Sequence, residues 1–319
     1  SFEKEYDMSQ VAIISCKSYD ESEVLAAVER GLTLLGGAEQ FVKPDENILL
    51  KLNWLTGDAP EKCVTTHPAV FRAVASVLQR AGAKLAYGDS PGFQSPDTAA
   101  KKTGCAEVAE QMNIPLADFR AGREAHYPEG KQNKKFVIAN AVLDSDGVVS
   151  LPKMKTHAFQ RVTGAVKNQF GCIPGALKGE FHVKVPDATD FARMLIDLNS
   201  FVHPRLYVMD GIMAMEGNGP RGGDPRQMNV LLFSRDPIAM DATMCRIMNL
   251  DPALVLTNRV GAEMGAGAYA AEEIRLLGDP LEQFVATDYN VNRKPESDAP
   301  KKQQPNFIKQ AITPRPYIL

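Results

Sequence analysis

Closely spaced cysteines are missing from this sequence, and their absence excludes two kinds of metal site. The five cysteines are scattered singly along the 319 residues, and none of them forms a C-x-x-C pair. Structural zinc sites and ferredoxin-type clusters need closely spaced thiolates. We therefore expect no structural zinc site and no iron–sulfur cluster within this chain. Scattered cysteines of this kind are usually small buried side chains in a reducing compartment.

A basic excess and a long apolar run are missing too. The chain has 36 Lys and Arg residues against 39 Asp and Glu residues, a net charge of −3, which argues against a nucleic-acid-binding surface. No apolar run approaches the length of a membrane span, and the segment 1–5 lacks the form of a signal peptide. Because the chain opens on Ser1, its start is expected to be processed or tagged. We expect a cytoplasmic protein that has neither nucleic acid nor a membrane among its partners.

The sequence also lacks the familiar motifs of nucleotide-binding and hydrolytic enzymes. It contains no P-loop, no G-x-S-x-G elbow and no H-E-x-x-H pair. The glycine-rich segments 217–219 and 221–223 are not a dinucleotide fingerprint, because they precede a predicted strand and do not open a helix directly after one. These absences argue against the common nucleotide-binding, serine-hydrolase and zinc-peptidase functions.

What the sequence does contain is a regular alternation of short β-branched runs with amphipathic helical segments. Strands are expected at residues 11–15, 48–52, 84–87, 148–151, 206–209 and 230–233. Helices are expected at residues 21–35, 67–81, 97–112 (whole or broken at Gly104), 187–202 and, at least in part, 159–170, with two more after Asp236 and Asp251. Such alternation is typical of βαβ units. It predicts an α/β fold with a mostly parallel central sheet flanked by helices.

The predicted domain organisation is one α/β domain over residues 1–290. Residues from about 90 to 146 are a candidate for a small subsidiary lobe of this domain. The segment 291–319 is rich in Lys, Pro, Asn, Asp and Gln and has little to bury. It is therefore expected to be a linker-like extension.

The densest cluster of reactive side chains follows the strand predicted at 148–151. Pro152 ends that strand, and Lys153, Lys155, Thr156 and His157 come directly after it. In an open α/β sheet, residues just beyond the carboxyl ends of the strands line the ligand crevice. Lysines two residues apart in extended chain point the same way, so the two lysines could face one anion.

Polar residues follow the other predicted strands as well. Segments 51–53, 89–90, 210–218 and 234–236 each begin where a strand ends, and the segment 162–175 is equally dense in polar and glycine residues. Because ordinary loops are polar, plain solvation is the competing interpretation. The unusual share of Lys, Asn, Asp and His favours one cleft that binds a small anionic molecule. The expected ligand-binding residues are Lys51, Asn53, Asp89, Ser90, Lys153, Thr156, Lys167, Asn168, Glu216 and Asn218.

The candidate catalytic residues are His157, Lys155 and Asp210. An imidazole suits acid–base work near neutral pH and equally suits metal ligation, so the presence of a metal stays open. Burial would lower the pKa of a crowded lysine and make it a possible general base. Asp210 is a candidate base or an oxygen ligand for a hard cation. Asp241 lies among apolar residues and is expected either to be buried against a lysine or to face the site.

At these residues the chain resembles a family named only as domain of unknown function 362. The most specific matching segments are 151–157 and 163–171, and the resemblance covers residues 48–252, including 50–53, 81–90, 210–220 and 234–241. Many members of that family carry a ferredoxin-like segment with closely spaced cysteines, which implies redox work. This chain has no such segment, although residues 314–319 resemble the lead-in that often precedes it. The resemblance thus implies a possible cluster in a segment beyond Leu319 and a redox partner protein.

Three functions stay open at this point. The first is the non-cluster part of a redox protein, which binds an anionic substrate or an unknown cofactor. The second is an acid–base or metal-assisted enzyme that acts on a small carboxylate. The third is a non-catalytic module that binds a metabolite or a metal.

Overall fold

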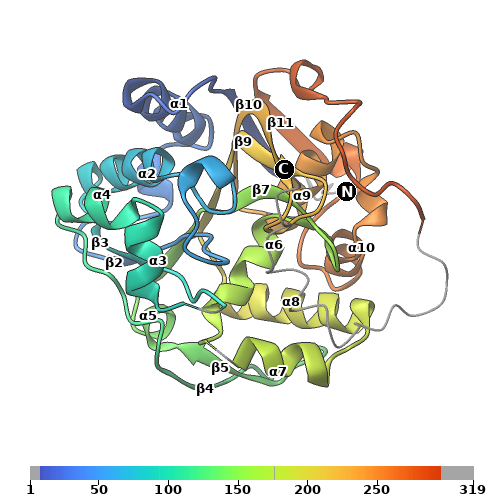
Figure 1. The fold of residues 1–319 in the computed structure, drawn as a ribbon, viewed down its shortest axis with the longest axis horizontal. Coiled ribbons are helices and arrows are strands. Elements are labelled where there is room, and N and C mark those ends of the chain that lie inside the picture. Colours follow the sequence, from blue (N-terminus) through green and yellow to red (C-terminus); the bar gives the residue numbers. More distant parts are fainter. Residues whose placement is uncertain (1–7, 93, 176, 296–319) are drawn as a thin grey trace, which may run out of the picture.

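The computed structural model describes residues 8–92, 94–175 and 177–295, and within them the chain forms a nine-stranded sheet with helices on both faces (Figure 1). The main strand order is β11-β1-β10-β9-β6-β2-β3, and β7 and β8 extend the sheet beside β9. The strands are β1 (Ser9–Ser15), β2 (Asn47–Lys51), β3 (Lys84–Gly88), β6 (Gly147–Ser150), β7 (Lys153–His157), β8 (Arg161–Thr163), β9 (Leu206–Glu216), β10 (Asp224–Ser234) and β11 (Ile274–Gly278).

Most neighbouring strands run parallel, as the sequence predicts. The pairs β11–β1, β9–β6, β6–β2 and β2–β3 are all parallel, whereas β10 is antiparallel to both β1 and β9. The strands β1, β2, β3, β6 and β9 therefore end at one edge of the sheet, the carboxyl edge, and begin at the opposite one, the amino edge. Because β10 runs the other way, Ser234, Arg235 and Asp236 lie at the amino edge. The expectation that they join the other strand-end residues is wrong.

The strands β9 and β10 are longer than the sequence predicts. They pair antiparallel along most of their length, with a register shift between Gln227 and Val230. The pairing of β6 with β9 stops at Ser150 and Tyr207, so β9 continues well past the end of β6. Asp210 consequently lies inside its own strand but just beyond the carboxyl end of the neighbouring one.

The helices begin largely where the sequence predicts. The carboxylates of Asp187 and Asp236 accept backbone N–H bonds at the starts of α8 and α9. Gly104, with φ 75°, separates α3 from α4, so the predicted helix at 97–112 is a broken pair. The region 159–170 is only partly helical. The helices are α1 (Glu21–Leu34), α2 (Pro68–Arg80), α3 (Pro96–Lys102), α4 (Cys105–Gln111), α5 (Asn140–Leu143), α6 (Ala165–Asn168), α7 (Leu177–Lys184), α8 (Ala188–Val202), α9 (Pro237–Ile247) and α10 (Leu256–Glu263).

The alternation of side chains along the strands explains why both faces of the sheet are covered. In β1, Ala12 and Ile14 pack into a core with α1 and α2, whereas Val11 and Ile13 pack into a core with α9. In β2, Leu49 points to a third core that includes α8. Successive residues of a strand face opposite sides, so apolar runs without alternation need helices on both sides. Figure 1 shows α1 and α2 apart from α8 and α10, with the sheet between them.

Two parts of the predicted domain organisation stay predictions. The strands β4 (Gly122–His126) and β5 (Lys135–Ala139) form a separate two-stranded sheet inside the expected lobe, while α4 packs on α2 in the main core. Tyr289 and Val291 are buried, and residues 296–319, including 314–319, lie outside the described residues. Among the helices that are described, none is long and apolar enough to cross a membrane.

Candidate functional site

The segment after β6 forms the centre of the candidate site. Beyond Pro152 the chain continues as β7, which runs parallel to β9 and places Lys153 opposite Asp210. All five residues of β7 are buried. The predicted extended conformation around Lys153 and Lys155 is therefore confirmed, and both ammonium groups lie in the protein interior at the carboxyl edge.

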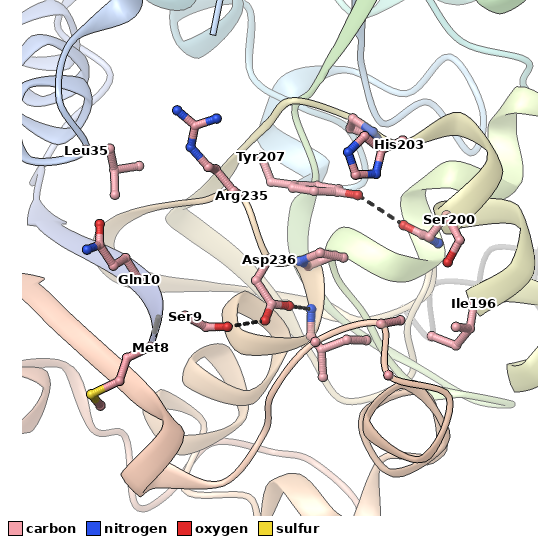
Figure 2. A pocket seen from close by; sticks show the side chains of 17 residues that line it. Met8, Ser9, Gln10, Leu35, Ile196, Ser200, His203, Tyr207, Arg235 and Asp236 are labelled. Carbon is pink, nitrogen blue, oxygen red and sulfur yellow. Dashed lines mark hydrogen bonds between the residues drawn. The ribbon is translucent and has the colours of Figure 1, made fainter. Parts of the chain in front are cut away.

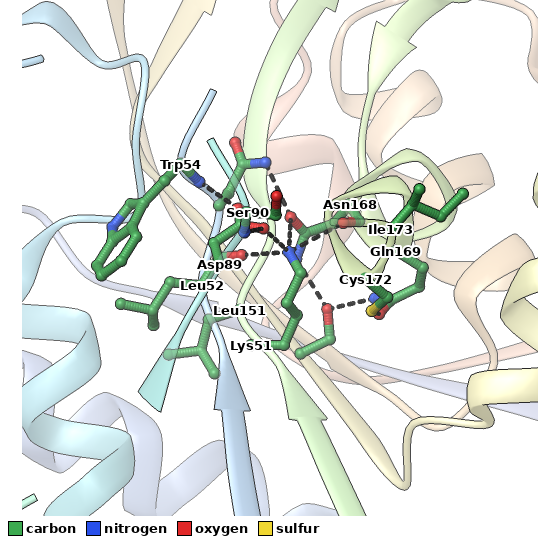
Figure 3. A network of polar contacts seen from close by, with 12 residues as sticks. Lys51, Leu52, Trp54, Asp89, Ser90, Leu151, Asn168, Gln169, Cys172 and Ile173 are labelled. Carbon is green, nitrogen blue, oxygen red and sulfur yellow. Dashed lines mark hydrogen bonds and ion pairs between the residues drawn. The ribbon is translucent and has the colours of Figure 1, made fainter. Parts of the chain in front are cut away.

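Lys51 and Asp89 form a buried ion pair beyond the ends of β2 and β3 (Figure 3). Lys51 Nζ lies 2.8 Å from Asp89 Oδ1 and donates to two backbone carbonyl groups at 2.7 and 3.0 Å. The carboxylate also accepts the backbone N–H groups of Trp54 at 2.6 Å and Ser90 at 2.7 Å. Three acceptors use the three protons of the ammonium group. This ion pair is complete without a ligand.

Amide side chains extend this polar contact toward β6. Asn53 Nδ2 donates to Asn168 Oδ1 at 2.8 Å, and Asn168 Nδ2 donates to Ser150 Oγ at 2.9 Å. Gly171 permits the close approach, because a Cβ atom there would lie 1.9 Å from the carboxylate and 2.7 Å from the ammonium group of the ion pair. The predicted residues from the ends of β2 and β3 and from α6 thus meet in one network, which Ser150 at the end of β6 joins.

Lys153 and Asp210 form a second buried ion pair, with 2.7 Å between Nζ and Oδ2. The hydroxyl of Tyr19 lies 3.0 Å from Lys153 Nζ and donates to Asp210 Oδ1 at 2.8 Å. Burial raises the pKa of Tyr19 well above its usual value, and the charge of Asp210 raises it further. The phenol therefore stays protonated and bridges the two charges.

His67 covers the outer side of this second pair. Its backbone N–H donates to Asp210 Oδ2 at 3.0 Å, and its ring stacks on Tyr19 with 3.5 Å between centroids. His67 Nδ1 accepts the backbone N–H of Ala69, so the side chain caps α2. Burial lowers the pKa of His67 to about 4, which keeps the ring neutral at neutral pH.

Lys155 differs from the two paired lysines. Its Nζ donates to the carbonyl of Val64 at 2.6 Å, and the described residues give it no carboxylate within ion-pair distance. Burial lowers the pKa of Lys155 to about 7, and the charge of Lys153 lowers it further. The buried hydroxyls of Thr65 and Thr163 have no hydrogen-bond partner among the described residues. Thr65 follows Val64 directly, and Thr163 is the β8 partner of Lys155.

Two more lysines lie near this cluster. Lys167, in α6, stands over the ring of Phe170 at 4.3 Å, and burial lowers its pKa to about 7. Lys178 donates to Ser90 Oγ at 2.6 Å and to the Ser90 carbonyl at 2.8 Å, and burial lowers its pKa to about 8. Ser90 is therefore held by a lysine that the sequence does not single out.

Three of the predicted residues line a separate cavity of about 190 Å³ near the end of β7, namely Thr156, His157 and Asn218. Thr156 Oγ1 donates to the Gly217 carbonyl at 3.0 Å. His157 Nδ1 accepts two backbone N–H bonds from the turn that follows it. Burial lowers the pKa of His157 well below its usual value, and the charge of Lys167 lowers it further. The neutral ring of His157 therefore uses its Nδ1 atom to organise the turn.

The remaining acidic residues hold the backbone around the site. Glu216 accepts the backbone N–H of Asn290 at 2.9 Å and lies 3.8 Å from Arg226. Asp241 accepts the N–H groups of Ala165 and Val166 at the start of α6, and burial raises its pKa to about 7. Of the two expected placements, against a lysine or facing the site, the first is wrong, because the partners of Asp241 are backbone groups.

Sequence reasoning missed Tyr19 and Lys178. Tyr19 lies four positions after the last residue of β1, so the strand-end argument applied to the first strand would have found it. Lys178 follows no strand, and no sequence signal indicates it. Within the described ranges, no group of three or more His, Cys, Asp and Glu side chains is arranged to hold a metal ion, and the question of a metal stays open.

Comparisons with known proteins agree with the resemblance. The family described as "Domain of unknown function (DUF362)" matches residues 48–246. Thylakoid-associated protein sll1697 of Synechocystis sp. is 38% identical over 279 residues, which are 87% of this chain and 86% of that protein.

The solved structures with a similar fold are less similar to this chain in sequence. The lactate racemase apoprotein from Thermoanaerobacterium thermosaccharolyticum is 14% identical with a TM-score of 0.46, over 77% of this chain and 58% of the other. A protein from Thermotoga maritima is 11% identical with a TM-score of 0.39, over 70% of this chain and 57% of the other. This chain thus spans less than two thirds of either structure. On the strength of the family match and the Synechocystis relative, the chain belongs to the DUF362 family.

Proposed function

We propose that this chain binds a small anionic molecule at the carboxyl edge, beside Lys155 and within reach of the charge of Lys167. The observation that carries the proposal is that Lys155 is 1% exposed and hydrogen-bonded to one backbone carbonyl, with no carboxylate of the described residues within ion-pair distance. A buried ammonium group is costly unless it is paired, and in such cases it often loses its proton. An anion would supply the missing partner.

The polar atoms around Lys155 support a particular kind of ligand. The hydroxyls of Thr65 and Thr163 and the Oδ1 atom of Asn53 are buried and have no partner in the described part of the chain. The backbone N–H of Asn53 donates to Oγ1 of Thr66 at 2.9 Å. Because Thr66 directly follows Thr65, Asn53 lies close to Thr65. Hydroxyls can donate, whereas the amide oxygen only accepts. A ligand with anionic oxygens and one hydroxyl, such as a hydroxycarboxylate or a phosphate monoanion, would accept from the two threonine hydroxyls and donate to the amide oxygen of Asn53.

The test is calorimetric titration of sulfate, phosphate and small hydroxycarboxylates into the parent protein and two variants. Lys155→Met removes the charge and keeps the apolar stem. Lys84→Met, at an exposed lysine paired with Asp45, is the matched control. We expect Lys155→Met to weaken anion binding at least tenfold and the control to bind as the parent does. Equal binding by all three proteins would contradict the proposal.

A second candidate is an acid–base enzyme that acts on a small carboxylate, with Lys155 as the base. The lowered pKa of about 7 leaves much of the amine unprotonated at neutral pH, as a general base requires. Asp210 and His157 are less suited, because their oxygen and Nδ1 atoms already accept hydrogen bonds. Solvent deuterium exchange at the α-carbon of a bound hydroxycarboxylate would test this role. Exchange that persists in Lys155→Met would exclude Lys155 as the base.

The redox association rests on the family resemblance alone. It predicts that the native protein carries closely spaced cysteines beyond Leu319, which sequencing of the complete coding region would test. The cytoplasmic location also stays a proposal, because the Synechocystis relative is described as thylakoid-associated. Cell fractionation with an antibody against this chain would decide between the two locations.

A further inference from the structure

A second cavity lies at the amino edge of the sheet, opposite the lysine cluster (Figure 2). It has a volume of about 470 Å³ and is lined by the start of β1, the end of α8, the start of β9 and the segment between β10 and α9. Small-molecule sites typically enclose about 300–1,000 Å³. None of the residues expected from the sequence to bind a ligand lines this cavity.

The acidic group of the amino-edge cavity already accepts several hydrogen bonds. Asp236 accepts the hydroxyl of Ser9 at 2.5 Å and the backbone N–H groups of Ile238 at 2.7 Å and Ala268 at 2.9 Å. Tyr207 donates its hydroxyl to Asn199 Oδ1 at 3.3 Å, so its polar end is also occupied. The ring of Tyr207, between Arg235 and His203 in Figure 2, is almost fully buried.

Arg235 is the polar group of the cavity with donors to spare. Its guanidinium lies over the ring of Phe41 at 4.2 Å, and it donates to the Gln40 carbonyl at 3.1 Å. The described residues place no carboxylate within ion-pair distance of it. A guanidinium has five N–H donors in a planar fork that fits carboxylate and phosphate groups. Stacking on Phe41 holds this fork in place, so less entropy is lost when an anion binds.

The rest of the lining is suited to an apolar body. Met8, Leu35, Pro237 and Ala266 contribute exposed or half-buried apolar surface, and the almost fully buried side chains of Ile196, Tyr207 and Ile238 lie behind it. We propose that the amino-edge cavity binds a small organic anion, with a carboxylate or phosphate head on Arg235 and a compact aromatic or aliphatic body against Leu35 and Pro237. This site is independent of the anion site at Lys155, because the two lie at opposite edges of the sheet.

The test uses phenylphosphate, benzoate and benzylamine as probes, with binding measured by calorimetry and located by crystal soaking. We expect phenylphosphate and benzoate to bind in the cavity and benzylamine not to bind. Arg235→Met should weaken phenylphosphate binding at least tenfold. The matched control, Arg259→Met on the exposed side of α10, should bind as the parent does.

A second variant keeps the proposal testable if loss of Arg235 disturbs the fold. Ser200→Phe fills the cavity from α8, and we expect it to abolish phenylphosphate binding while leaving the melting temperature within a few degrees of the parent. Phenylphosphate bound equally by the parent, Arg235→Met and Ser200→Phe would overturn the proposal, as would equal binding of benzylamine. Lys155→Met should leave phenylphosphate binding at this cavity unchanged, which separates this site from the one at the carboxyl edge.

Discussion

The paired lysines of the carboxyl edge, Lys51 and Lys153, and the unpaired lysine, Lys155, differ in the acceptors that their ammonium groups contact. Lys51 and Lys153 each contact a buried aspartate within 2.8 Å and donate further hydrogen bonds to neighbouring groups. Among the described residues, the Lys155 ammonium group has one hydrogen-bond acceptor, the Val64 carbonyl. All three are almost fully buried. Burial alone therefore does not distinguish a structural lysine from a candidate ligand-binding one. The number and charge of the acceptors around the ammonium group distinguish them.

This difference assigns separate roles to groups that look alike in the sequence. A buried ion pair with satisfied hydrogen bonds organises the chain and is damaged when one partner is lost. A buried ammonium group without an anion is poorly stabilised in the folded state, so its removal costs little stability. We expect the paired lysines to hold the site together and Lys155 to contact the ligand. The following variants test that division.

The largest expected effect on the unfolding free energy comes from removing one member of a buried ion pair. Asp89→Asn leaves Lys51 buried without a counter-charge, and such losses cost about 3–5 kcal/mol of unfolding free energy. The double variant Lys51→Met, Asp89→Leu should recover much of that loss, because it removes both buried charges. Urea denaturation of the two proteins would measure both values. A loss below about 1 kcal/mol for Asp89→Asn would show that the pair is not structural.

The second effect tests how closely Gly171 packs against the ion pair of Lys51 and Asp89. A Cβ atom at Gly171 would overlap the carboxylate of Asp89, so Gly171→Ala should cost about 1–3 kcal/mol through forced displacement. Gly179, in α7, has nothing within 4 Å of its Cβ position. Gly179→Ala should therefore stabilise the protein by about 0.5–1 kcal/mol as an ordinary helical substitution. Equal thermal stability of the two variants would contradict the close approach.

The third effect is a pH dependence of the unfolding free energy that Lys155 contributes. Its pKa is about 7 in the folded protein and near 10.5 when unfolded. Between these values the unfolded chain binds a proton that the folded chain has lost, so the unfolding free energy rises with pH. The slope for one proton is at most about 1.4 kcal/mol per pH unit. Below pH 7 both states hold the proton and the contribution is flat.

The variant Lys155→Met isolates this dependence. Subtracting its unfolding free energy from that of the parent cancels the other titrating groups, including Lys167 and Lys178. We expect the difference to increase from pH 7 to pH 10 in favour of the parent. Two parallel curves would mean that Lys155 keeps its proton throughout this range and that the unpaired description is wrong.

The smallest expected effect concerns the bridge over the second pair. Tyr19→Phe removes the hydroxyl that links Lys153 with Asp210 and keeps the ring that stacks on His67. The two charges still contact each other directly, so we expect a loss of about 1–2 kcal/mol. Thermal unfolding of the variant measures this loss. An unchanged melting temperature would show that the phenol is not part of the network.

The fold could be predicted from the sequence to a large extent, because β-branched runs and helix caps are local signals. Asp187 and Asp236 mark two helix starts correctly from their own side chains and the residues next to them. The direction of β10 could not be predicted, because it depends on the long antiparallel pairing with β9. That pairing moves Arg235 and Asp236 to the amino edge, where they line a different cavity.

The candidate site could be predicted as a set of residues but not as a set of contacts. The position of Lys51, Asp89, Lys153 and Asp210 after strand ends indicated one edge of the sheet, and the structure brings them into two ion pairs. Each aspartate partner comes from a segment that is distant in the sequence, so no local pattern shows which lysine is paired. Asp241 shows the same limit, since its partners are the N–H groups of α6, which no local pattern reveals.

Sulfate binding as a function of pH, compared between the parent and Lys155→Met, tests the central claim most directly. Sulfate keeps its charge across the neutral range, so any pH dependence belongs to the protein. The account predicts that sulfate binds the parent more tightly as the pH falls through about 7, when Lys155 gains its proton, and that Lys155→Met loses most of the affinity and most of its pH dependence, with the remainder coming from Lys167. Sulfate affinity that is the same in both proteins at every pH would contradict the anion site.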